Sequence, residues 1–449
     1  MKKTCIAVVA LIAVAAPLRA ELVDLKILHR EPYADGKSFG EVGPYEKIVG
    51  IAKFAVDPKH PKNKIIVDLD LAPTNQQGLV EFESDVYILA PKDLSKGNGA
   101  LFYDVNNRGN KLALGMFNTP ADNPFLLNRG YTVVWSGWIG ELLPGGDRLL
   151  LKPPVALENG QPVRGIVRFE MSSDKPVKSM PLSRRDNHGS YRPTPEGLAK
   201  ATLTRRNLEG DPRVVIPPRL WQVKVQPMIE VKEGVPGTLP QVRLELTEGF
   251  EPGVLYELIC ECEGSIVQGT GFAAVRDLMA FLKYVHSPRN PLRQPNGQKA
   301  FDRAYAFGVS QSGRFLRHFL WQGFNEDEKS RMVFDGLMPH VAGGGLGFFN
   351  HRFAQPTRHN GQHEDHSYPA DMFPFTYSPD GILMNDFLNA KWTKVMHTQS
   401  AAEYWHRSGS LVHTELGEGI QDAYIPENVR IYSFGGTQHG PAAEPLKPG

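Results

Sequence analysis

A serine lies in a turn whose residue types could support nucleophilic catalysis. The run that begins at Ala304 is apolar and strand-like, Gly308-Val309-Ser310-Gln311-Ser312-Gly313 follows, and a helix with one apolar side extends to Leu320. A serine on such a strand-to-helix turn has its Oγ exposed, and the next backbone N–H, that of Gln311, can point at the oxyanion of acyl transfer. Two alternatives stay open: a serine that only caps the helix, and Ser312 as the nucleophile.

A serine hydroxyl attacks only if a base takes its proton, and behind such a turn an acid and then a histidine are expected in chain order. His439 lies in a Gly-rich loop directly after the strand-like run Val429–Phe434. Glu403 follows the strand-like run Trp392–Thr398 and is the predicted acid. Alternatively, Glu403 only stabilises the first turn of a helix. The other carboxylates considered for the acid are Asp422, Glu415 and Asp335.

The oxyanion needs a second donor from a loop after an upstream strand. The segment Asn106-Asn107-Arg108-Gly109-Asn110 follows the strand-like run Ala100–Val105. We therefore predict an oxyanion hole formed by the backbone N–H of Gln311 and that of Arg108 or Gly109. A plain Asn/Gly turn is the alternative.

The remaining patterns indicate alternating strands and helices with one interruption. Strands are predicted at Ile48–Val56, Lys64–Leu69, Ser84–Leu89, Ala100–Val105 and Tyr131–Gly137, with helical segments in Lys111–Arg129 and Ala273–Val285. From about Gly145 to Glu257 the sequence contains short strand-like runs separated by Pro and Gly residues. This pattern predicts a β-rich insertion. The expected organisation is a leader at 1–20, the first part of the main domain at 21–144, the insertion at 145–257, and the second part of the main domain at 258–449.

The first twenty residues are typical of a secretory leader. Lys2 and Lys3 precede an apolar run from Cys5 to Leu18, and the small residue Ala20 precedes polar Glu21. The run is shorter than the roughly 20 residues that cross a bilayer. We therefore expect an exported protein, periplasmic or secreted, that is not held in the membrane after removal of the leader.

Composition favours a small-molecule partner. Fifty basic and 49 acidic residues give a formal net charge of +1, which would not attract nucleic acid or an anionic membrane. Basic residues at Arg184, Arg185, Arg205 and Arg206 could bind an acidic sugar or acyl group or form a solvated face. Cys260 and Cys262 are too close in sequence for an easy disulfide, so no structural disulfide is expected.

No cofactor or metal is expected. Gly343–Gly347 is glycine-rich but is not followed by the Lys-Ser/Thr of a phosphate-binding loop, and no dinucleotide-binding fingerprint is evident. One histidine-rich loop offers a rival metal site, although its Pro and Gly residues break any helix, and a solvated lid is the preferred interpretation. Its possible ligands are His351, His359, His363, Glu364, Asp365 and His366.

Several phrases spread over the mature chain resemble the bacterial α/β-hydrolase domain-containing proteins, a group of esterase-like serine hydrolases. The phrases are Val42–Gly50, Asn107–Asn110, Gly271–Asp277, Gly308–Arg314, Asn350–Phe353, Glu403–Trp405 and Gly436–Gly440. The resemblance implies an α/β-hydrolase fold: a mostly parallel central sheet flanked by helices, here with a β-rich insertion. The layout is also similar to that of glucuronoyl esterases, whose nucleophile turn likewise lacks the usual second glycine.

Family members continue past the histidine loop with a further helix, whereas this chain ends at Gly449, ten residues after His439. We therefore expect a C-terminally short member in which one apolar sheet face is less covered. Two functional hypotheses follow. The first is an exported hydrolase that cleaves a carboxylic ester with Ser310, His439 and Glu403 through an acyl-enzyme. The second is a non-catalytic homologue that binds a small molecule or glycan.

Overall fold

The computed structural model describes residues 21–118, 123–226, 239–294, 301–357, 372–385, 393–415 and 421–440. The predicted leader at 1–20 lies outside these ranges, so export stays a prediction. None of the helices within the described ranges combines the length and the apolarity needed to cross a bilayer.

The chain forms many strands and few helices. The strands are β1 Glu21–Pro32, β2 Ser38–Phe39, β3 Gly43–Val56, β4 Val80–Pro91, β5 Ala100–Val105, β6 Thr132–Ser136, β7 Leu151–Lys152, β8 Leu157–Glu158, β9 Gln161–Pro162, β10 Arg164–Met171, β11 Val177–Pro181, β12 Arg192–Pro193, β13 Thr202–Arg206, β14 Val214–Val215, β15 Trp221–Val225, β16 Val242–Phe250, β17 Leu255–Glu263, β18 Arg303–Val309, β19 Gly336–His340, β20 Lys394–Ser400 and β21 Val429–Phe434. The helices are α1 Ala113–Phe117, α2 Phe125–Asn128, α3 Pro195–Ala199, α4 Thr270–Tyr284, α5 Gln311–Trp321 and α6 Ala401–His406. Short 3-10 helices are η1 Tyr33–Gly36, η2 Leu69–Leu71, η3 Leu94–Lys96, η4 Pro218–Leu220 and η6 Ser410–Val412.

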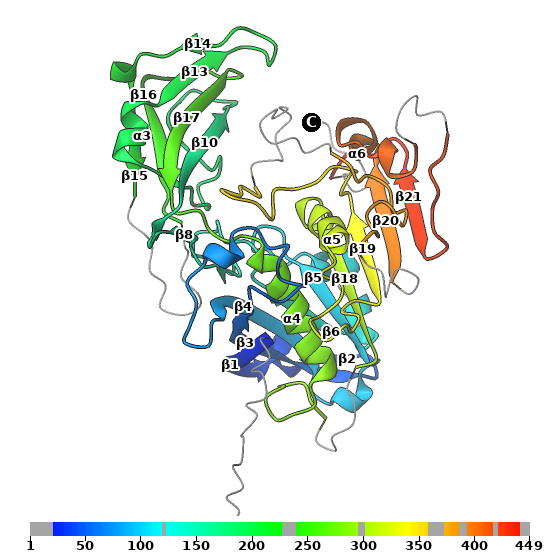
Figure 1. The fold of residues 1–449 in the computed structure, drawn as a ribbon. Coiled ribbons are helices and arrows are strands. Elements are labelled where there is room, and N and C mark those ends of the chain that lie inside the picture. The colour runs from blue at the N-terminus through cyan, green and yellow to red at the C-terminus, as the bar shows by residue number, and fades with distance from the viewer. Residues whose placement is uncertain are drawn as a thin grey trace, which may run out of the picture.

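One large sheet organises the molecule (Figure 1), in the strand order β1-β3-β4-β6-β5-β18-β19-β20-β21. Strands β6, β5, β18, β19, β20 and β21 are parallel to one another. In contrast, β1, β3, β4 and β6 pair antiparallel, and β2 and β7 add antiparallel pairings. The expected mostly parallel sheet is therefore corrected to a mixed sheet, because its N-terminal part is built from long hairpin-like strands.

The strands between residues 157 and 263 form smaller sheets of their own. One has the order β10-β17-β13-β14 with β12 beside β17, another is β11-β16-β15, and β8 pairs with β9. In Figure 1 the two larger of these, with α3, stand apart from the main sheet. The expected insertion at 145–257 overlaps this part of the chain, but its first strand, β7, pairs with β4 of the main sheet. Its end at 257 lies inside β17, which pairs with β10 as far as Glu263.

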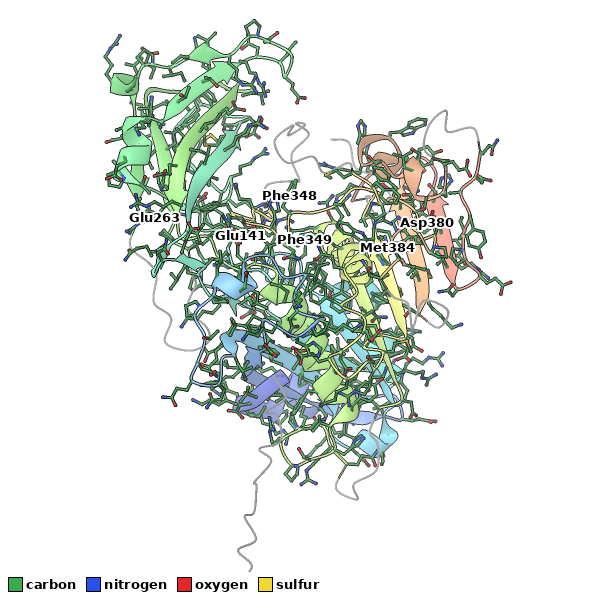
Figure 2. All side chains as sticks on the ribbon, in the orientation of Figure 1. Glu141, Glu263, Phe348, Phe349, Asp380 and Met384 are labelled. Carbon is green, nitrogen blue, oxygen red and sulfur yellow. The ribbon has the colours of Figure 1, made fainter. Side chains whose placement is uncertain are left out.

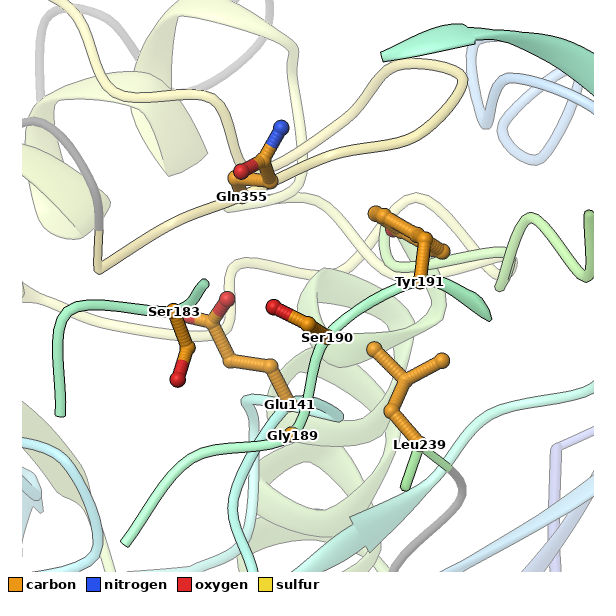
Figure 3. Close-up of a pocket in the computed structure, with 7 residues that line it drawn as sticks. All are labelled: Glu141, Ser183, Gly189, Ser190, Tyr191, Leu239 and Gln355. Atoms are coloured by element: carbon orange, nitrogen blue, oxygen red, sulfur yellow. The ribbon is translucent and has the colours of Figure 1, made fainter. Parts of the chain in front are cut away.

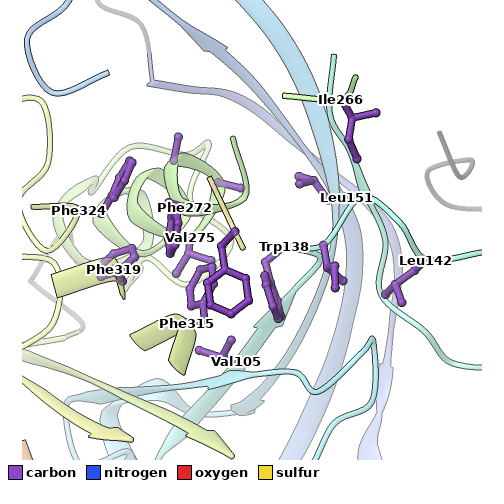
Figure 4. Close-up of a cluster of buried hydrophobic side chains, with 14 of the residues drawn as sticks. Val105, Trp138, Leu142, Leu151, Ile266, Phe272, Val275, Phe315, Phe319 and Phe324 are labelled. Carbon is purple, nitrogen blue, oxygen red and sulfur yellow. The ribbon is translucent and has the colours of Figure 1, made fainter. Parts of the chain in front are cut away.

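Helices cover both faces of the main sheet. On one face α4 and α5 bury a group of aromatic rings, and Phe315 of α5 lies between Trp138 and Phe272, at 4.5 Å from each ring centroid (Figure 4). On the other face Ala113 of α1 and Leu126 of α2 pack with Phe102 and Phe307. Successive residues of a strand therefore point into the hydrophobic cores on opposite faces of the sheet, because the strand is pleated.

Replacement of Phe315 tests how firmly α5 is anchored. Phe315 is 1% exposed, and Phe315→Ala is expected to lower the free energy of unfolding by about 3–5 kcal/mol, because it removes a buried ring and leaves a cavity. Denaturant unfolding measures this loss. Phe125→Ala is the matched control, because Phe125 is 47% exposed, and it should cost less than about 1 kcal/mol. Equal effects of the two variants would contradict this packing.

Most predicted strands are confirmed, but Lys64–Leu69 is wrong. This segment forms turns that lead into η2, even though Ile65, Ile66 and Val67 favour a strand. The side chain of Asn350 accepts a hydrogen bond from Val67 N and donates one to Ile65 O, both at 2.9 Å. Because a distant amide satisfies this backbone, it needs no strand partner.

Candidate active site

Ser310 and the loop after β5 lie where the order of the strands along the sheet reverses. The chain leaves β5 to form β6 on one side, whereas it leaves β18 to form β19 on the other, and β5 and β18 are adjacent and parallel. Crevices at the carboxyl ends of such strands are the usual ligand sites of open α/β sheets. The loop that begins at Asn106 and the turn at Ser310 both start at this edge.

Ser310 occupies the tight turn that the sequence predicts. It joins the end of β18 to the first residue of α5, and its φ of 59° and ψ of −115° lie outside the regions that L-residues ordinarily adopt. Such backbone strain is found at functional sites. Although Ser310 is at the N-cap position, its side chain makes no capping hydrogen bond within α5. The helix-capping alternative therefore has no contact to support it.

Close packing explains the glycine pattern of the turn. A Cβ at Gly308 would lie 2.4 Å from Ser312 O, and a Cβ at Gly313 would lie 2.9 Å from Gly308 O. The second position that must lack a side chain is thus Gly313 rather than 312. Ser312 is fully buried, and its Oγ donates to Asn106 O at 3.1 Å. Ser312 thereby ties the turn to the loop after β5, and this contact argues against it as the nucleophile.

The structure brings Glu403 and His439 into direct contact. His439 Nδ1 is hydrogen-bonded to Glu403 Oε1, while Glu403 Oε2 accepts from the backbone N–H of Ser400 at 2.9 Å and from the Ser400 hydroxyl. Glu403 is therefore both the capping-box residue of α6 and the partner of the histidine. Burial alone would raise the pKa of Glu403, but the hydrogen bonds from His439 and Ser400 outweigh it and hold that pKa at about 2.

A second histidine, His340, which was not predicted, contacts both the backbone of Ser310 and the strand that precedes Glu403. Ser310 N donates to the backbone oxygen of His340 at 2.8 Å, and His340 Nδ1 is hydrogen-bonded to Thr398 Oγ1 at 2.7 Å. Thr398 is on β20, two residues before the Ser400 that holds Glu403. Burial lowers the pKa of His340, while Glu403 raises it and His439 lowers it further. The only sequence signal was a histidine at the end of an apolar run.

The residues predicted to donate to the oxyanion differ in their hydrogen bonds and backbone conformation. Gly109 N donates to Asn106 Oδ1 at 2.8 Å, so its N–H already has an acceptor. Arg108 has a φ of 52°, a left-handed conformation that is uncommon for a residue with a side chain. Gln311 is the first residue of α5, and its side chain donates to Pro356 O at 2.7 Å. Because Gly109 N–H already has an acceptor, Gly109 is the less available of the two loop donors.

The other carboxylates considered for the catalytic acid lie in environments that differ from that of Glu403. Asp335 precedes β19, at the edge of the sheet opposite to Ser310, rather than following a strand as expected. It accepts from Ala304 N at 2.8 Å and from Lys283 Nζ at 2.7 Å. Asp422 and Glu415 are both exposed. Within the described residues, Glu403 is the one of these carboxylates that contacts His439.

A buried carboxyl group lies beside the site without having been predicted. Glu141, near the junction with the smaller sheets (Figure 2), is 4% exposed, and its Oε1 accepts from Thr357 N at 2.6 Å. Burial raises the pKa of Glu141 to about 7, although Thr357, Arg108 and Arg185 lower it. Figure 3 shows Glu141 facing a cavity of about 10 Å³, large enough for roughly one water molecule. Its other lining residues are Ser183, Gly189, Ser190, Tyr191, Leu239 and Gln355.

The raised pKa of Glu141 makes the free energy of unfolding depend on pH. Its folded-state pKa is raised from 4.5 to about 7, so folding holds the proton and stability falls as pH rises from 4.5 to 7, by up to about 3 kcal/mol. Glu141→Gln can still accept from Thr357 N and removes this term. We expect the variant to gain unfolding free energy relative to wild type at pH 8 but not at pH 4.5, as measured by urea denaturation. An identical difference at both pH values would contradict the raised pKa.

The metal alternative receives no support from the described part of the chain. No three His, Cys, Asp or Glu side chains gather there as metal ligands. His359, His363, Glu364, Asp365 and His366 lie outside the described residues, so that loop is not tested. Cys260 and Cys262 are buried free thiols with their Sγ atoms 3.7 Å apart. The prediction that they form no disulfide therefore holds.

Comparison with known proteins places this site in a class. Residues 243–448, the part of the chain that contains Ser310, Glu403 and His439, match a family model described as alpha/beta hydrolase domain. The resemblance found in the sequence is thereby confirmed. A glucuronoyl esterase from Solibacter usitatus is similar with a TM-score of 0.33 and 11% identity, over 94% of this chain and 82% of that one. No curated protein matches the chain.

Proposed function

We propose that this protein is an exported serine hydrolase that cleaves a carboxylic ester through an acyl-enzyme. The contact between His439 Nδ1 and Glu403 Oε1 carries the proposal, because the sequence nominated these residues independently as base and acid. The carboxylate fixes the imidazole with its proton on Nδ1, which leaves Nε2 as the acceptor. The strained turn at Ser310 and the hydrolase family of residues 243–448 support the same assignment.

The chemistry assigns one task to each group. Ser310 Oγ attacks the ester carbonyl while His439 Nε2 takes the hydroxyl proton, and the backbone N–H groups of Gln311 and Arg108 stabilise the oxyanion. The tetrahedral intermediate collapses, and His439 gives its proton to the departing alcohol. Water, deprotonated by His439, then releases the acid and restores Ser310. Glu403 remains ionised throughout and stabilises the imidazolium.

A fluorophosphonate probe tests this proposal on the leaderless protein, because the probe reacts with activated serine hydroxyls. We expect labelling of wild type and of Ser312→Ala, and none of Ser310→Ala. Folding of each variant is checked by circular dichroism. Folded wild type that remains unlabelled and inert toward short-chain p-nitrophenyl esters would favour the non-catalytic binding protein instead.

A further inference from the structure

The first of two consecutive asparagines after β5 is a buried junction between three segments. Asn106 is fully buried, and its side chain donates through Nδ2 to Ser136 O and accepts through Oδ1 from Gly109 N at 2.8 Å. Its backbone oxygen accepts from Trp138 Nε1 at 2.8 Å and from Ser312 Oγ at 3.1 Å. The beginning of the loop is therefore fixed both to the end of β6 and to the nucleophile turn.

The second asparagine, Asn107, connects the loop to the backbone beside the nucleophile. The pairing of β5 with β18 ends at Val105 and Gly308. Beyond this last pair, Asn107 Nδ2 donates to Val309 O at 2.9 Å, and Val309 immediately precedes Ser310. A side-chain amide thus continues the connection between the two strands after their backbone pairing has ended, because the backbone of the loop turns away.

The other polar groups of Asn107 hold the loop in its own shape. Asn107 N donates to Asn110 O at 2.9 Å, and Asn110 N donates to Asn107 O at 3.0 Å, which closes residues 107–110 into a tight turn. Asn107 Oδ1 accepts from Arg108 Nη1 at 2.7 Å. The turn is therefore a closed unit, and the Asn107 amide attaches this unit to Val309. Loss of that contact would let the whole turn move relative to Ser310.

We propose that Asn107 is a positioning residue, which holds the oxyanion donor of the turn 107–110 at the correct separation from Gln311 N and Ser310. This inference rests on the proposed ester hydrolysis at Ser310. Donors stabilise an oxyanion only from the place where its charge develops, and a misplacement of about 1 Å can cost about hundredfold in rate. Asn107 itself contacts neither the substrate nor the reacting atoms, so its effect is exerted through the turn.

Asn107→Asp tests the contact with Val309 selectively. Asp has the same shape as Asn and keeps an oxygen for Arg108 Nη1, but its second oxygen cannot donate and would repel Val309 O. We expect kcat for p-nitrophenyl butyrate to fall by a factor of about 10–100, while KM changes by less than about threefold, because the oxyanion forms only after the substrate is bound. Asn107→Ala, which loses both contacts, should lose at least as much kcat.

A trifluoromethyl ketone inhibitor supplies a readout that a purely structural role would not change. Ser310 Oγ adds to its carbonyl carbon, the hydroxyl proton passes to His439, and the resulting oxyanion resembles that of the transition state. The affinity for this inhibitor should therefore fall by the same factor as kcat/KM in both Asn107 variants. Titration with a fluorophosphonate, run to completion, gives the concentration of competent enzyme, so that unfolded protein is not counted as lost catalysis.

Asn110→Ala is the matched control, because Asn110 is exposed and its side chain donates to Asn107 O, an acceptor that Asn110 N also uses. It should change kcat and inhibitor affinity by less than about threefold. If Asn107→Ala does not fold, the isosteric Asp variant decides the question. Wild-type kcat in Asn107→Asp, or a loss confined to KM, would overturn the positioning role and leave the proposed function standing. Folded wild type that neither cleaves the ester nor binds the inhibitor would overturn both.

Discussion

Ser310→Ala is expected to reduce kcat/KM for a short-chain p-nitrophenyl ester by a factor of about 10⁴ or more. Removal of the nucleophile leaves only the oxyanion donors and substrate binding, which account for a small part of catalysis in serine hydrolases. The loss should appear in kcat, because Oγ forms a bond only after the substrate is bound. Initial rates over a range of ester concentrations separate kcat from KM.

Ser312→Ala is the matched control for this loss. Both serines lie in the same turn, but Ser312 Oγ donates to Asn106 O, so its removal loses one buried hydrogen bond and leaves that carbonyl less satisfied. The expected cost is about 1–3 kcal/mol of stability, with less than a tenfold change in kcat. If Ser312→Ala lost activity as completely as Ser310→Ala, the assignment of the nucleophile would be wrong.

The sequence could place Ser310, Glu403 and His439 at one edge of the sheet because each follows the end of a strand closely. The runs before Ser310, Glu403 and His439 are apolar enough to indicate strands, and the parallel pairing of β18, β19, β20 and β21 brings their carboxyl ends to one edge. Local pattern and chain order are thus sufficient for these positions. The requirement for Gly313 was missed because it depends on how closely α5 approaches β18.

Glu141 and His340 were not predicted because their properties depend on distant partners. Glu141 meets Thr357, 216 residues further along the chain, and His340 meets Thr398, 58 residues further. Burial of a carboxyl group and its raised pKa have no local signature beyond apolar neighbours.

The first strand was missed for a different reason. In β1 the pairing with β3 shifts register between Leu22 and Asp24 and again between Ile27 and His29. The first bulge lets Leu22 and Leu25, three positions apart, both be buried. The resulting spacing does not match the alternation of two that predicts a half-buried strand. Strands without bulges at the site, such as β5 and β21, were predicted with their observed bounds.

Glu403→Gln is expected to reduce kcat by a factor of about 10³–10⁴ while the fold is retained. The amide oxygen of Gln can still accept from Ser400 N, and Gln is compatible with a capping box. However, its NH₂ group would donate to His439 Nδ1 and place the ring proton on Nε2, where the proton of Ser310 must be received. The pKa of Glu403 is held at about 2, so wild type keeps the carboxylate charged down to about pH 3 and avoids this tautomer.

Ser400→Ala separates the catalytic role of Glu403 from its structural one. It removes the hydroxyl that donates to Glu403 Oε2 and leaves Oε1 with His439, so it should cost about 1 kcal/mol of stability through the lost cap and less than a tenfold change in kcat. Kinetics and thermal unfolding of both variants decide between the roles. A Glu403→Gln protein with wild-type kcat would show that the carboxylate only caps α6 and that the acid must be sought elsewhere. Loss of activity with an unchanged melting temperature would instead identify Glu403 as the group that orients the base.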